Sequence, residues 1–164
     1  MGDELAGECF VEQHAGWGIE RHLECFGRCE PHEFFGLVVE LHIRAVAGGV
    51  MSDYWFSEAK ADDLVRINGP LGSFFLRDAA GLDLVFLATG TGIAPIKAMI
   101  EAMPQLAVSK LPRSVTVVWG GRAQDDIYLD VAAMPGNQVF IPVLSRASAS
   151  WAGARGYVQQ ALLE

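Results

Sequence analysis

Hydrophobic and polar positions follow different periods in the two halves of the chain. In the first half, residues 35–44 are rich in β-favouring side chains and alternate apolar with polar toward their end, and residues 64–68 alternate throughout. Residues 73–77 predict a further short strand. Residues 1–30 show no clear period, so no element is assigned to them. The first half is therefore predicted to be antiparallel β structure.

The second half begins after a polar break near residue 80. Its short apolar runs predict strands at residues 84–88, 115–119 and 138–143. The first two runs are typical of strands that are buried on both faces of a sheet. Helices are predicted after these strands, at residues 93–103, 125–131 and 156–163. Strands that alternate with helices in this way indicate a parallel sheet with crossover helices.

The composition excludes several classes of function. The 164 residues are 51% hydrophobic and 20% charged, so the chain is predicted to fold around a core. Its 12 Lys and Arg against 20 Asp and Glu give a net charge of −8, which argues against general nucleic-acid or anionic-membrane binding. No run approaches the roughly 20 apolar residues of a membrane span, and the N-terminus lacks the features of a signal peptide. We therefore expect a cytoplasmic protein with no membrane span and no nucleic-acid partner.

The cysteines do not indicate a disulfide framework, because such a framework needs an even number. This chain has three, all within the first thirty residues. Cys25 and Cys29, together with His32, raise the alternative of a zinc site, although their spacing is not that of the common structural zinc pairs. Free thiols are the favoured interpretation, and no metal site is predicted.

The most informative motif is a glycine-rich segment between the strand at 84–88 and the helix that follows it. Its residues are Gly90, Thr91, Gly92, Ile93, Ala94 and Pro95. Glycines there let the backbone approach a phosphate closely, and a helix N-terminus offers unpaired N–H groups and the positive end of its dipole. The alternative is a plain glycine-rich turn, but this position at the carboxyl end of a buried strand favours a diphosphate ligand.

A second anion-binding candidate precedes a short helix predicted over residues 53–59, for which Ser52 is the expected N-terminal cap. It consists of Gly49, Val50, Met51 and Ser52. A capped helix without a ligand explains this pattern equally well.

A third set of candidates follows the two later strands. Arg122 comes after the strand at 115–119, and Ser145 and Arg146 come after the strand at 138–143. Because the carboxyl ends of parallel strands meet at one edge of a sheet, these side chains are predicted to face the same crevice, where Arg suits a ribose or a phosphate. Solvated surface arginines are the alternative.

Taken together, these motifs resemble those of the ferredoxin–NADP reductase superfamily, whose members join a flavin-binding β-barrel to a nicotinamide-binding α/β domain. The matching segments are GVMS at 49–52, GPLG at 69–72, GTGIAP at 90–95 and LSR at 144–146. The likeness runs from about residue 31 to residue 164. Longer stretches such as GGVMSDYWF and FLATGTGIAPIKAM are similar to the branch that includes CDP-6-deoxy-3,4-glucoseen reductase.

The resemblance implies an NAD(P)H-dependent oxidoreductase that carries FAD or FMN. In that family a hydride passes from the nicotinamide to the flavin, and electrons then leave singly to an iron–sulfur partner. The partner would be a separate protein, because this sequence contains no ferredoxin-like set of cysteines. The choice between NADH and NADPH stays open.

The resemblance also implies roles for individual residues, none of them catalytic. Three are expected along the flavin: His42, Ile43 and Arg44. Gly49 to Ser52 would bind its phosphate. Thr91 and its neighbouring glycines would bind the nicotinamide nucleotide's diphosphate. The residues expected around the adenosine are Arg122, Ser145, Arg146 and Tyr157.

The sequence departs from the family at both ends. The Arg-x-Tyr-Ser segment that clasps the flavin is expected before residue 38, where this chain reads Gly27-Arg28-Cys29-Glu30. The first half of the barrel and the terminal Cys-Gly segment have no counterpart either. These departures predict a truncated or frame-shifted copy in which residues 1–30 are unrelated to the family.

The predicted fold class is α/β plus β, a partial antiparallel flavin-binding barrel followed by an incomplete Rossmann-like parallel sheet with crossover helices. The predicted domains are an unassigned segment at 1–30, the partial barrel at 31–80 and a C-terminally incomplete NAD(P)-binding domain at 81–164. Two other functions are left open: a nucleotide-binding remnant without redox turnover, and an interaction module that uses the N-terminal Cys and His residues.

Overall fold

The fold was analysed in a computed structural model, which describes residues 8–14, 20–28, 37–61, 63–65 and 72–163. The chain divides into two compact units, Met1–Ser73 and Phe74–Glu164. In the described part of the chain, no helix has the length and apolar character needed to cross a bilayer.

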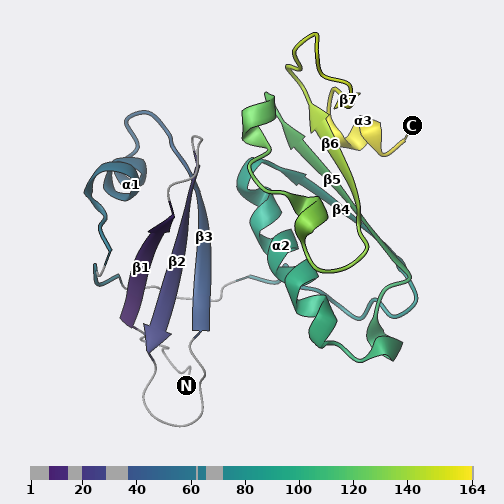
Figure 1. The fold of residues 1–164 in the computed structure, drawn as a ribbon, viewed down its shortest axis with the longest axis horizontal. Helices are drawn as coiled ribbons and strands as arrows, with labels where there is room; N and C mark the ends of the chain where they lie inside the picture. The colour runs from purple at the N-terminus through teal and green to yellow at the C-terminus, as the bar shows by residue number, and fades with distance from the viewer. Residues whose placement is uncertain (1–7, 15–19, 29–36, 62, 66–71, 164) are drawn as a thin grey trace. The chain divides into compact units, whose positions relative to one another are not determined.

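The first unit contains a three-stranded antiparallel sheet, shown in purple and blue in Figure 1. Its strands are β1 (Glu8–His14), β2 (Glu20–Arg28) and β3 (Leu37–Arg44). The central strand β2 pairs with β1 on one side and with β3 on the other. The strand predicted at 35–44 is confirmed over its described residues, whereas β1 and β2 lie in the segment to which no element was assigned. Closure of this sheet into a barrel remains a prediction.

The chain leaves β3 through a turn in which Gly48 has a φ of +70°, a conformation that favours glycine. Helix α1 (Val50–Asp53) follows and continues directly into a π-helical turn over Tyr54–Glu58. Trp55 and Ala59 are buried there and pack with Leu41 and Ile43 of β3. A helix is therefore present as predicted, although it begins three residues earlier than expected.

The predicted role of Ser52 as the helix cap is wrong, because Gly49 occupies the N-cap position. Ser52 lies inside α1, and its Oγ accepts a hydrogen bond from the Val46 N–H at 2.9 Å. The hydroxyl thus closes the turn that precedes the helix instead of capping the helix itself.

Two strands predicted on either side of the boundary between the units are not formed in the described residues. Val65 makes only an isolated bridge, and the rest of the 64–68 prediction falls on residues 66–68, outside the described residues. Residues 73–77 are irregular, and the rings of Phe74 and Phe75 are exposed. The apolar side chains at 74–76 are consecutive and do not alternate, so they could not bury one face of a strand.

The second unit is built on a four-stranded parallel sheet in the order β4-β5-β6-β7 (Figure 1). The strands are β4 (Asp83–Thr89), β5 (Ser114–Gly121), β6 (Val139–Leu144) and β7 (Ala154–Arg155). Its α-helices are α2 (Ile93–Ala102) and α3 (Val158–Ala161). Short 3-10 turns join these elements, at Gly90–Gly92, Met103–Gln105, Val108–Lys110, Gln124–Asp126 and Val131–Ala133. The predicted parallel sheet is confirmed.

Two helices differ from their prediction. The helix expected over 125–131 is absent, and two separate 3-10 turns occupy this stretch instead. The last helix is shorter than the predicted 156–163, because Gly156 has a φ of +106° and places the helix start at Val158.

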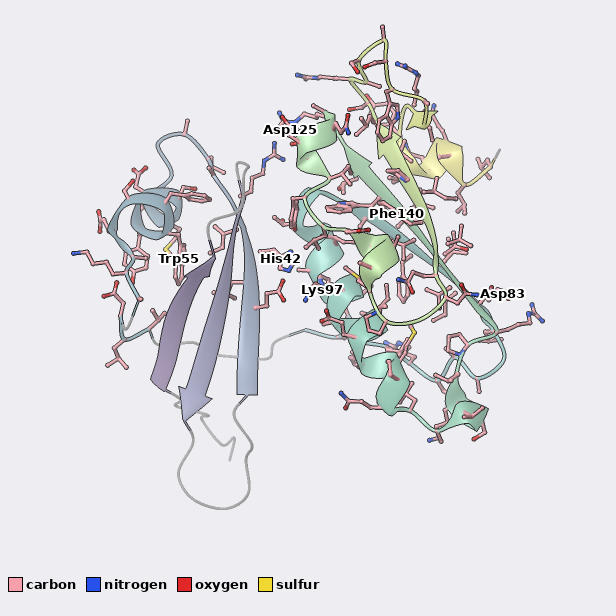
Figure 2. The ribbon with its side chains drawn as sticks, viewed as in Figure 1. His42, Trp55, Asp83, Lys97, Asp125 and Phe140 are labelled. Carbon is pink, nitrogen blue, oxygen red and sulfur yellow. The ribbon has the colours of Figure 1, made fainter. Side chains whose placement is uncertain are left out.

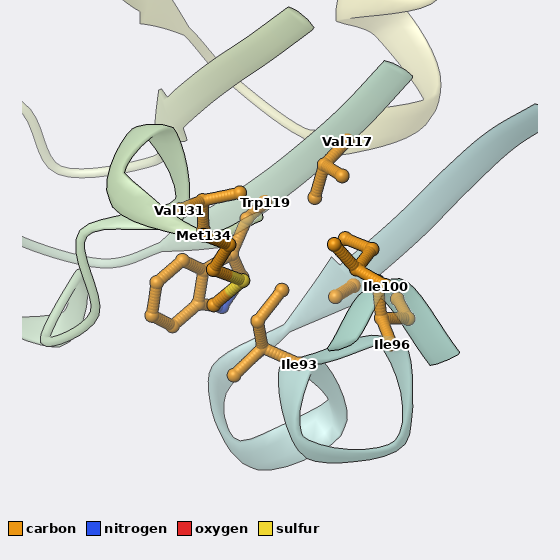
Figure 3. Close-up of a cluster of buried hydrophobic side chains, with 8 residues drawn as sticks. Ile93, Ile96, Ile100, Val117, Trp119, Val131 and Met134 are labelled. Atoms are coloured by element: carbon orange, nitrogen blue, oxygen red, sulfur yellow. The ribbon is translucent and has the colours of Figure 1, made fainter. Parts of the chain in front are cut away.

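The core of this unit lies between α2 and one face of the sheet. Ile93, Ile96 and Ile100 of α2 pack against Val117 and Trp119 of β5, all of them almost fully buried (Figure 3). This burial confirms the apolar face predicted for the helix. It also fixes the start of α2 relative to the ends of the strands, which is where the candidate ligand site lies.

Burial on both faces is confirmed for β5 and wrong for β4. Val117, Val118 and Trp119 of β5 are all fully buried. In β4, by contrast, Val85 is 47% exposed and Leu87 is 43% exposed. The reason is position, because β4 is the edge strand of the sheet and the four-residue helix α3 covers only part of its second face.

An ion pair joins the beginnings of β4 and β5 (Figure 2 labels Asp83). The Asp83 carboxylate accepts hydrogen bonds from the Arg113 guanidinium and, at 2.7 Å, from the Ser114 hydroxyl. These bonds lower the pKa of Asp83 from 3.8 to about 2, with the Arg113 bond as the larger cause. Since the folded state lowers this pKa, the pair stabilises the fold above about pH 4 and ceases to do so as the pH falls toward 2.

We expect Asp83→Asn to lower the free energy of unfolding slightly near neutral pH, and this effect to disappear as the pH falls through about 2. The effect is small because both side chains are largely exposed. Urea unfolding of the two chains across this pH range measures the difference, with Asp125→Asn as an exposed control. A difference that persists unchanged at pH 2 would contradict the assignment.

Candidate nucleotide-binding site

The glycine-rich segment forms a tight turn between β4 and α2, and we call Gly90–Gly92 the GTG loop. It is a single 3-10 turn that follows Thr89 directly, and Gly92 is the N-cap of α2. Gly90 has a φ of +51°, which an L side chain rarely adopts. Gly92 is exposed, and a Cβ added to it would meet no heavy atom within 4 Å. Open space therefore lies over the N-terminus of the helix, where N–H groups lack helical partners.

The other residues of the predicted segment divide between the surface and the core. Thr91 and Ala94 are half-buried and Pro95 is exposed, so the side chains of these three are accessible at the helix start. Ile93 is fully buried in the core. Its side chain therefore does not face a ligand, and its backbone N–H is used within the turn, where it donates to the Gly90 carbonyl.

Two further loops are joined to each other at the same edge of the sheet. The Ser145 N–H donates to the Gly121 carbonyl at 3.0 Å, and the Arg146 N–H donates to the Arg122 carbonyl at 2.8 Å. These bonds continue the pairing of β5 with β6 beyond the ends of the strands. The structure thus brings Arg122, Ser145 and Arg146 together, and all three side chains are exposed.

Asp126 holds the first of these loops, a role that the sequence analysis missed. Its Oδ2 accepts hydrogen bonds from the backbone N–H groups of Arg122, at 2.6 Å, and of Ala123, at 3.1 Å. The same oxygen lies 4.0 Å from Nε of Arg122. A pattern of Arg followed by Asp four residues later is the only sequence signal for this contact.

Tyr157 is brought to this edge by the chain that follows β7. The Gly156 N–H donates to the Leu144 carbonyl at 3.1 Å, and Tyr157 is the N-cap of α3 with a 62% exposed side chain. Helix α3 then packs on β5, where a Cβ on Gly120 would lie 2.7 Å from Cγ1 of Val158. Close packing at a glycine therefore sets the position of Tyr157.

The residues of this edge fit a dinucleotide. The GTG loop offers an open helix N-terminus for a diphosphate. Neighbouring parallel strands are about 4.8 Å apart, so the loops after β5 and β6 lie roughly 5 to 10 Å away, which matches the distance from a diphosphate to its adenosine. Exposed Arg and Ser side chains at that distance suit ribose or phosphate oxygens.

The candidate flavin residues of the first unit do not share one face. His42 and Ile43 alternate along β3, so they point to opposite sides of the sheet. Ile43 packs with the buried Trp55, whereas Nε2 of His42 lies 2.7 Å from Oε1 of Glu40 (Figure 2 labels His42 and Trp55). Arg44 is exposed at the end of the strand. The three residues therefore cannot all line one flavin with their side chains.

The phosphate candidate of the same unit is an exposed turn. Val50 and Met51 are 82% and 63% exposed at the start of α1, and Gly49 is held by a hydrogen bond from its N–H to the Val46 carbonyl. The exposed start of α1 fits an anionic group.

No group of three or more His, Cys, Asp or Glu side chains that could hold a metal occurs among the residues that the structure describes. Two of the residues weighed for zinc, Cys29 and His32, lie outside the described residues.

Comparison with known protein families assigns both units. Residues 36–76 match the oxidoreductase FAD-binding domain, and residues 86–164 match the oxidoreductase NAD-binding domain. The chain belongs to the ferredoxin–NADP reductase superfamily. The resemblance inferred from the sequence motifs is confirmed, as are FAD and NAD(P)H as the cofactors of its domains.

Relatives in this superfamily include a CDP-6-deoxy-L-threo-D-glycero-4-hexulose-3-dehydrase reductase of Yersinia pestis, which is 43% identical over 77% of this chain and 38% of its own length. Protein RfbI of Salmonella typhimurium is 38% identical over 77% of this chain and 38% of its length. The reductase component DmpP of a Pseudomonas phenol 2-monooxygenase is 32% identical over 75% of this chain and 36% of its own length. The chain thus spans less than two fifths of these curated relatives.

Solved structures share the fold. The Amycolatopsis cytochrome P450 reductase GcoB superposes with a TM-score of 0.76 at 25% identity, over 99% of this chain and 58% of that one. The ferredoxin reductase of carbazole 1,9a-dioxygenase gives a TM-score of 0.77 at 17% identity, over 97% of this chain and 56% of that one.

Proposed function

We propose that this chain is an NAD(P)H-dependent flavin oxidoreductase that delivers electrons to a separate iron–sulfur protein. The observation that carries the proposal is the open GTG loop at the start of α2, inside a segment that matches the oxidoreductase NAD-binding domain. When bound, the two cofactors supply the chemistry: the reduced nicotinamide gives a hydride to the flavin, and the flavin gives up electrons.

In this proposal the segment 81–164 binds the nicotinamide nucleotide. The backbone N–H groups of Thr91 and Gly92 face its diphosphate, supported by the open space over Gly92. Arg122, Ser145 and Arg146 hold the adenosine half, supported by the backbone bonds that place the two loops together. Tyr157 borders the same half.

The segment 31–80 binds the flavin in this proposal, as part of an antiparallel barrel. The match of residues 36–76 to the oxidoreductase FAD-binding domain supports this role. Gly49 and Ser52 shape the turn whose exposed N–H groups face the flavin's phosphate, because the Ser52 hydroxyl holds the Val46 N–H. His42 and Arg44 share the face of β3 opposite to Trp55, so they are the strand residues proposed to contact the flavin.

The proposed electron acceptor follows from what the relatives are named for. One is a dehydrase reductase, one is the reductase component of a monooxygenase, and a third is the electron transfer component of a xylene/toluene monooxygenase. All three names describe proteins that serve a second protein. We therefore place the final acceptor on a partner chain.

A second candidate function is nucleotide binding without redox turnover. The observation that favours it is that the buried cluster beside the GTG loop is made entirely from residues 86–140, within the second unit. The core that supports the GTG loop therefore uses no residue of the first unit, so in this second candidate nucleotide binding persists when the flavin site is empty.

Optical spectroscopy separates the two candidates. The purified chain is mixed with FAD or FMN, freed of excess flavin, and titrated without oxygen with NADH and with NADPH. The proposal predicts retained absorbance at about 450 nm that is bleached by one of the two nucleotides. Nucleotide binding by calorimetry without retained flavin would establish the second candidate instead, and absence of both would overturn the two together.

A further inference from the structure

Trp119 is the largest fully buried side chain of the chain's described core, and it touches the GTG loop directly. Its indole Nε1–H donates a hydrogen bond to the Gly90 carbonyl at 3.0 Å, across 29 positions of sequence. The same carbonyl also accepts the N–H of Ile93 within the 3-10 turn. Both lone pairs of this oxygen are therefore used, one by the turn itself and one by the core.

The indole has little freedom to turn away from the loop. Its ring packs edge-on against Tyr128, with centroids 5.1 Å apart and planes at 84°, and lies 6.4 Å from Phe140. Its backbone pairs with Ala88 on one side and Pro142 on the other. A buried indole N–H without an acceptor would be costly, so the Gly90 carbonyl is held where the ring requires it.

This bond determines where the neighbouring amide points. In a trans peptide unit the carbonyl and the N–H lie in one plane and point in opposite directions. Because the Gly90 carbonyl is drawn toward the core, the Thr91 N–H of the same peptide unit is directed away from the core. That side is where Gly92 is exposed and open. A glycine with a φ of +51° lets the backbone adopt this orientation.

We infer that Trp119 is a positioning residue for the diphosphate, acting through the Gly90–Thr91 peptide, an inference that rests on the proposed nucleotide binding. It fixes the direction of an N–H donor without approaching the ligand itself. Phenylalanine would fill most of the same volume, but it has no donor to hold the carbonyl.

The test compares Trp119→Phe with Phe140→Leu in the full chain. The control alters a ring that packs on the same indole, and phenylalanine supplies no hydrogen-bond donor. ADP is the probe, and calorimetry measures its dissociation constant. We expect Trp119→Phe to weaken ADP binding roughly three- to tenfold, and Phe140→Leu to leave it within about twofold even though both variants lose stability.

A second readout reports on the bond itself. In the 15N-labelled wild-type chain, which has four tryptophans, the Trp119 indole N–H signal is identified by its loss in Trp119→Phe. We expect this signal to shift on addition of ADP and of inorganic pyrophosphate, because both draw on the N–H of the peptide unit that it anchors. If Trp119→Phe does not fold, Trp17→Phe, Trp55→Phe and Trp151→Phe identify the signal by elimination.

The outcomes distinguish the inference from the proposed function. If the wild-type chain binds ADP but Trp119→Phe binds it equally well, or the indole signal does not respond, Trp119 has a purely structural role and the inference is overturned. An equal loss of affinity in Phe140→Leu would overturn it as well. If the wild-type chain binds no ADP, the proposed nucleotide binding fails, and the inference fails with it.

Discussion

Gly92→Ala is expected to abolish most of the affinity for nicotinamide nucleotides while leaving the fold intact. Gly92 has an ordinary helical φ of −61°, and its added methyl group would meet no protein atom within 4 Å. The methyl group would instead occupy the space proposed for the diphosphate. We expect the dissociation constants of NADH and ADP to rise on the order of tenfold or more, and the free energy of unfolding to change by less than about 1 kcal/mol.

Calorimetry and urea unfolding measure these two quantities on the same preparations. Ala98→Ser is the matched control, because Ala98 is exposed farther along α2 and the substitution also adds a single heavy atom. Unchanged binding by Gly92→Ala would show that the diphosphate does not approach the GTG loop. The role proposed for the loop would then be wrong.

Gly120→Ala is expected to destabilise the second unit strongly. The added Cβ would lie 2.7 Å from Cγ1 of Val158 and 3.3 Å from Cγ2 of Thr89. Both are β-branched side chains with little rotamer freedom, and Gly120 is buried between them. Overpacking of this kind costs about 1–3 kcal/mol, which urea unfolding measures directly.

The double variant Gly120→Ala, Val158→Ala tests the cause. Removal of the Val158 methyl groups opens the space that the new Cβ needs, so part of the lost stability is expected to return. The clash in Gly120→Ala would displace Val158 and with it Tyr157, the N-cap of α3. We therefore expect nucleotide affinity to fall in Gly120→Ala and to recover together with stability in the double variant. If the double variant loses as much free energy of unfolding as the two single variants lose together, contact with Val158 is not the cause.

The sequence predicted the second unit well because its strands and main helix have strong local patterns. Consecutive β-branched residues at 115–118 indicated β5, and the helical spacing of Ile96 and Ile100 indicated the buried face of α2. The exposure of Val85 was not predictable in this way. An apolar run shows that side chains are suited to burial, but the neighbouring elements decide whether they are covered.

The first unit was predicted less completely for two physical reasons. No alternation marks β1 and β2 in the sequence, so strand pairing was not apparent there. Ser52 was a reasonable helix cap by residue type, but glycine also caps helices, and Gly49 takes the position because it allows the tight turn from Val46. Local propensity could not rank these two alternatives.

Sequence motifs pointed to the residues of the candidate site, but they did not reveal the contacts that support those residues. Glycines after a buried strand pointed to the GTG loop, and the arginines after β5 and β6 pointed to the same edge. The Trp119 indole and the Asp126 carboxylate act on these loops through hydrogen bonds that only the folded chain creates. Trp119 was recognised as an apolar strand residue, and its single polar atom gave no signal in the sequence.

The ion pair at the start of β4 has a consequence for the behaviour of the protein at high concentration. β4 is an edge strand with exposed apolar side chains, and such edges can pair with the edges of other molecules. Asp83 is the first residue of β4, and its carboxylate, paired with the Arg113 guanidinium next to the start of β5, is 48% exposed. A strand that added to β4 would have to strip water from this charge, so we expect the pair to disfavour intermolecular sheet formation.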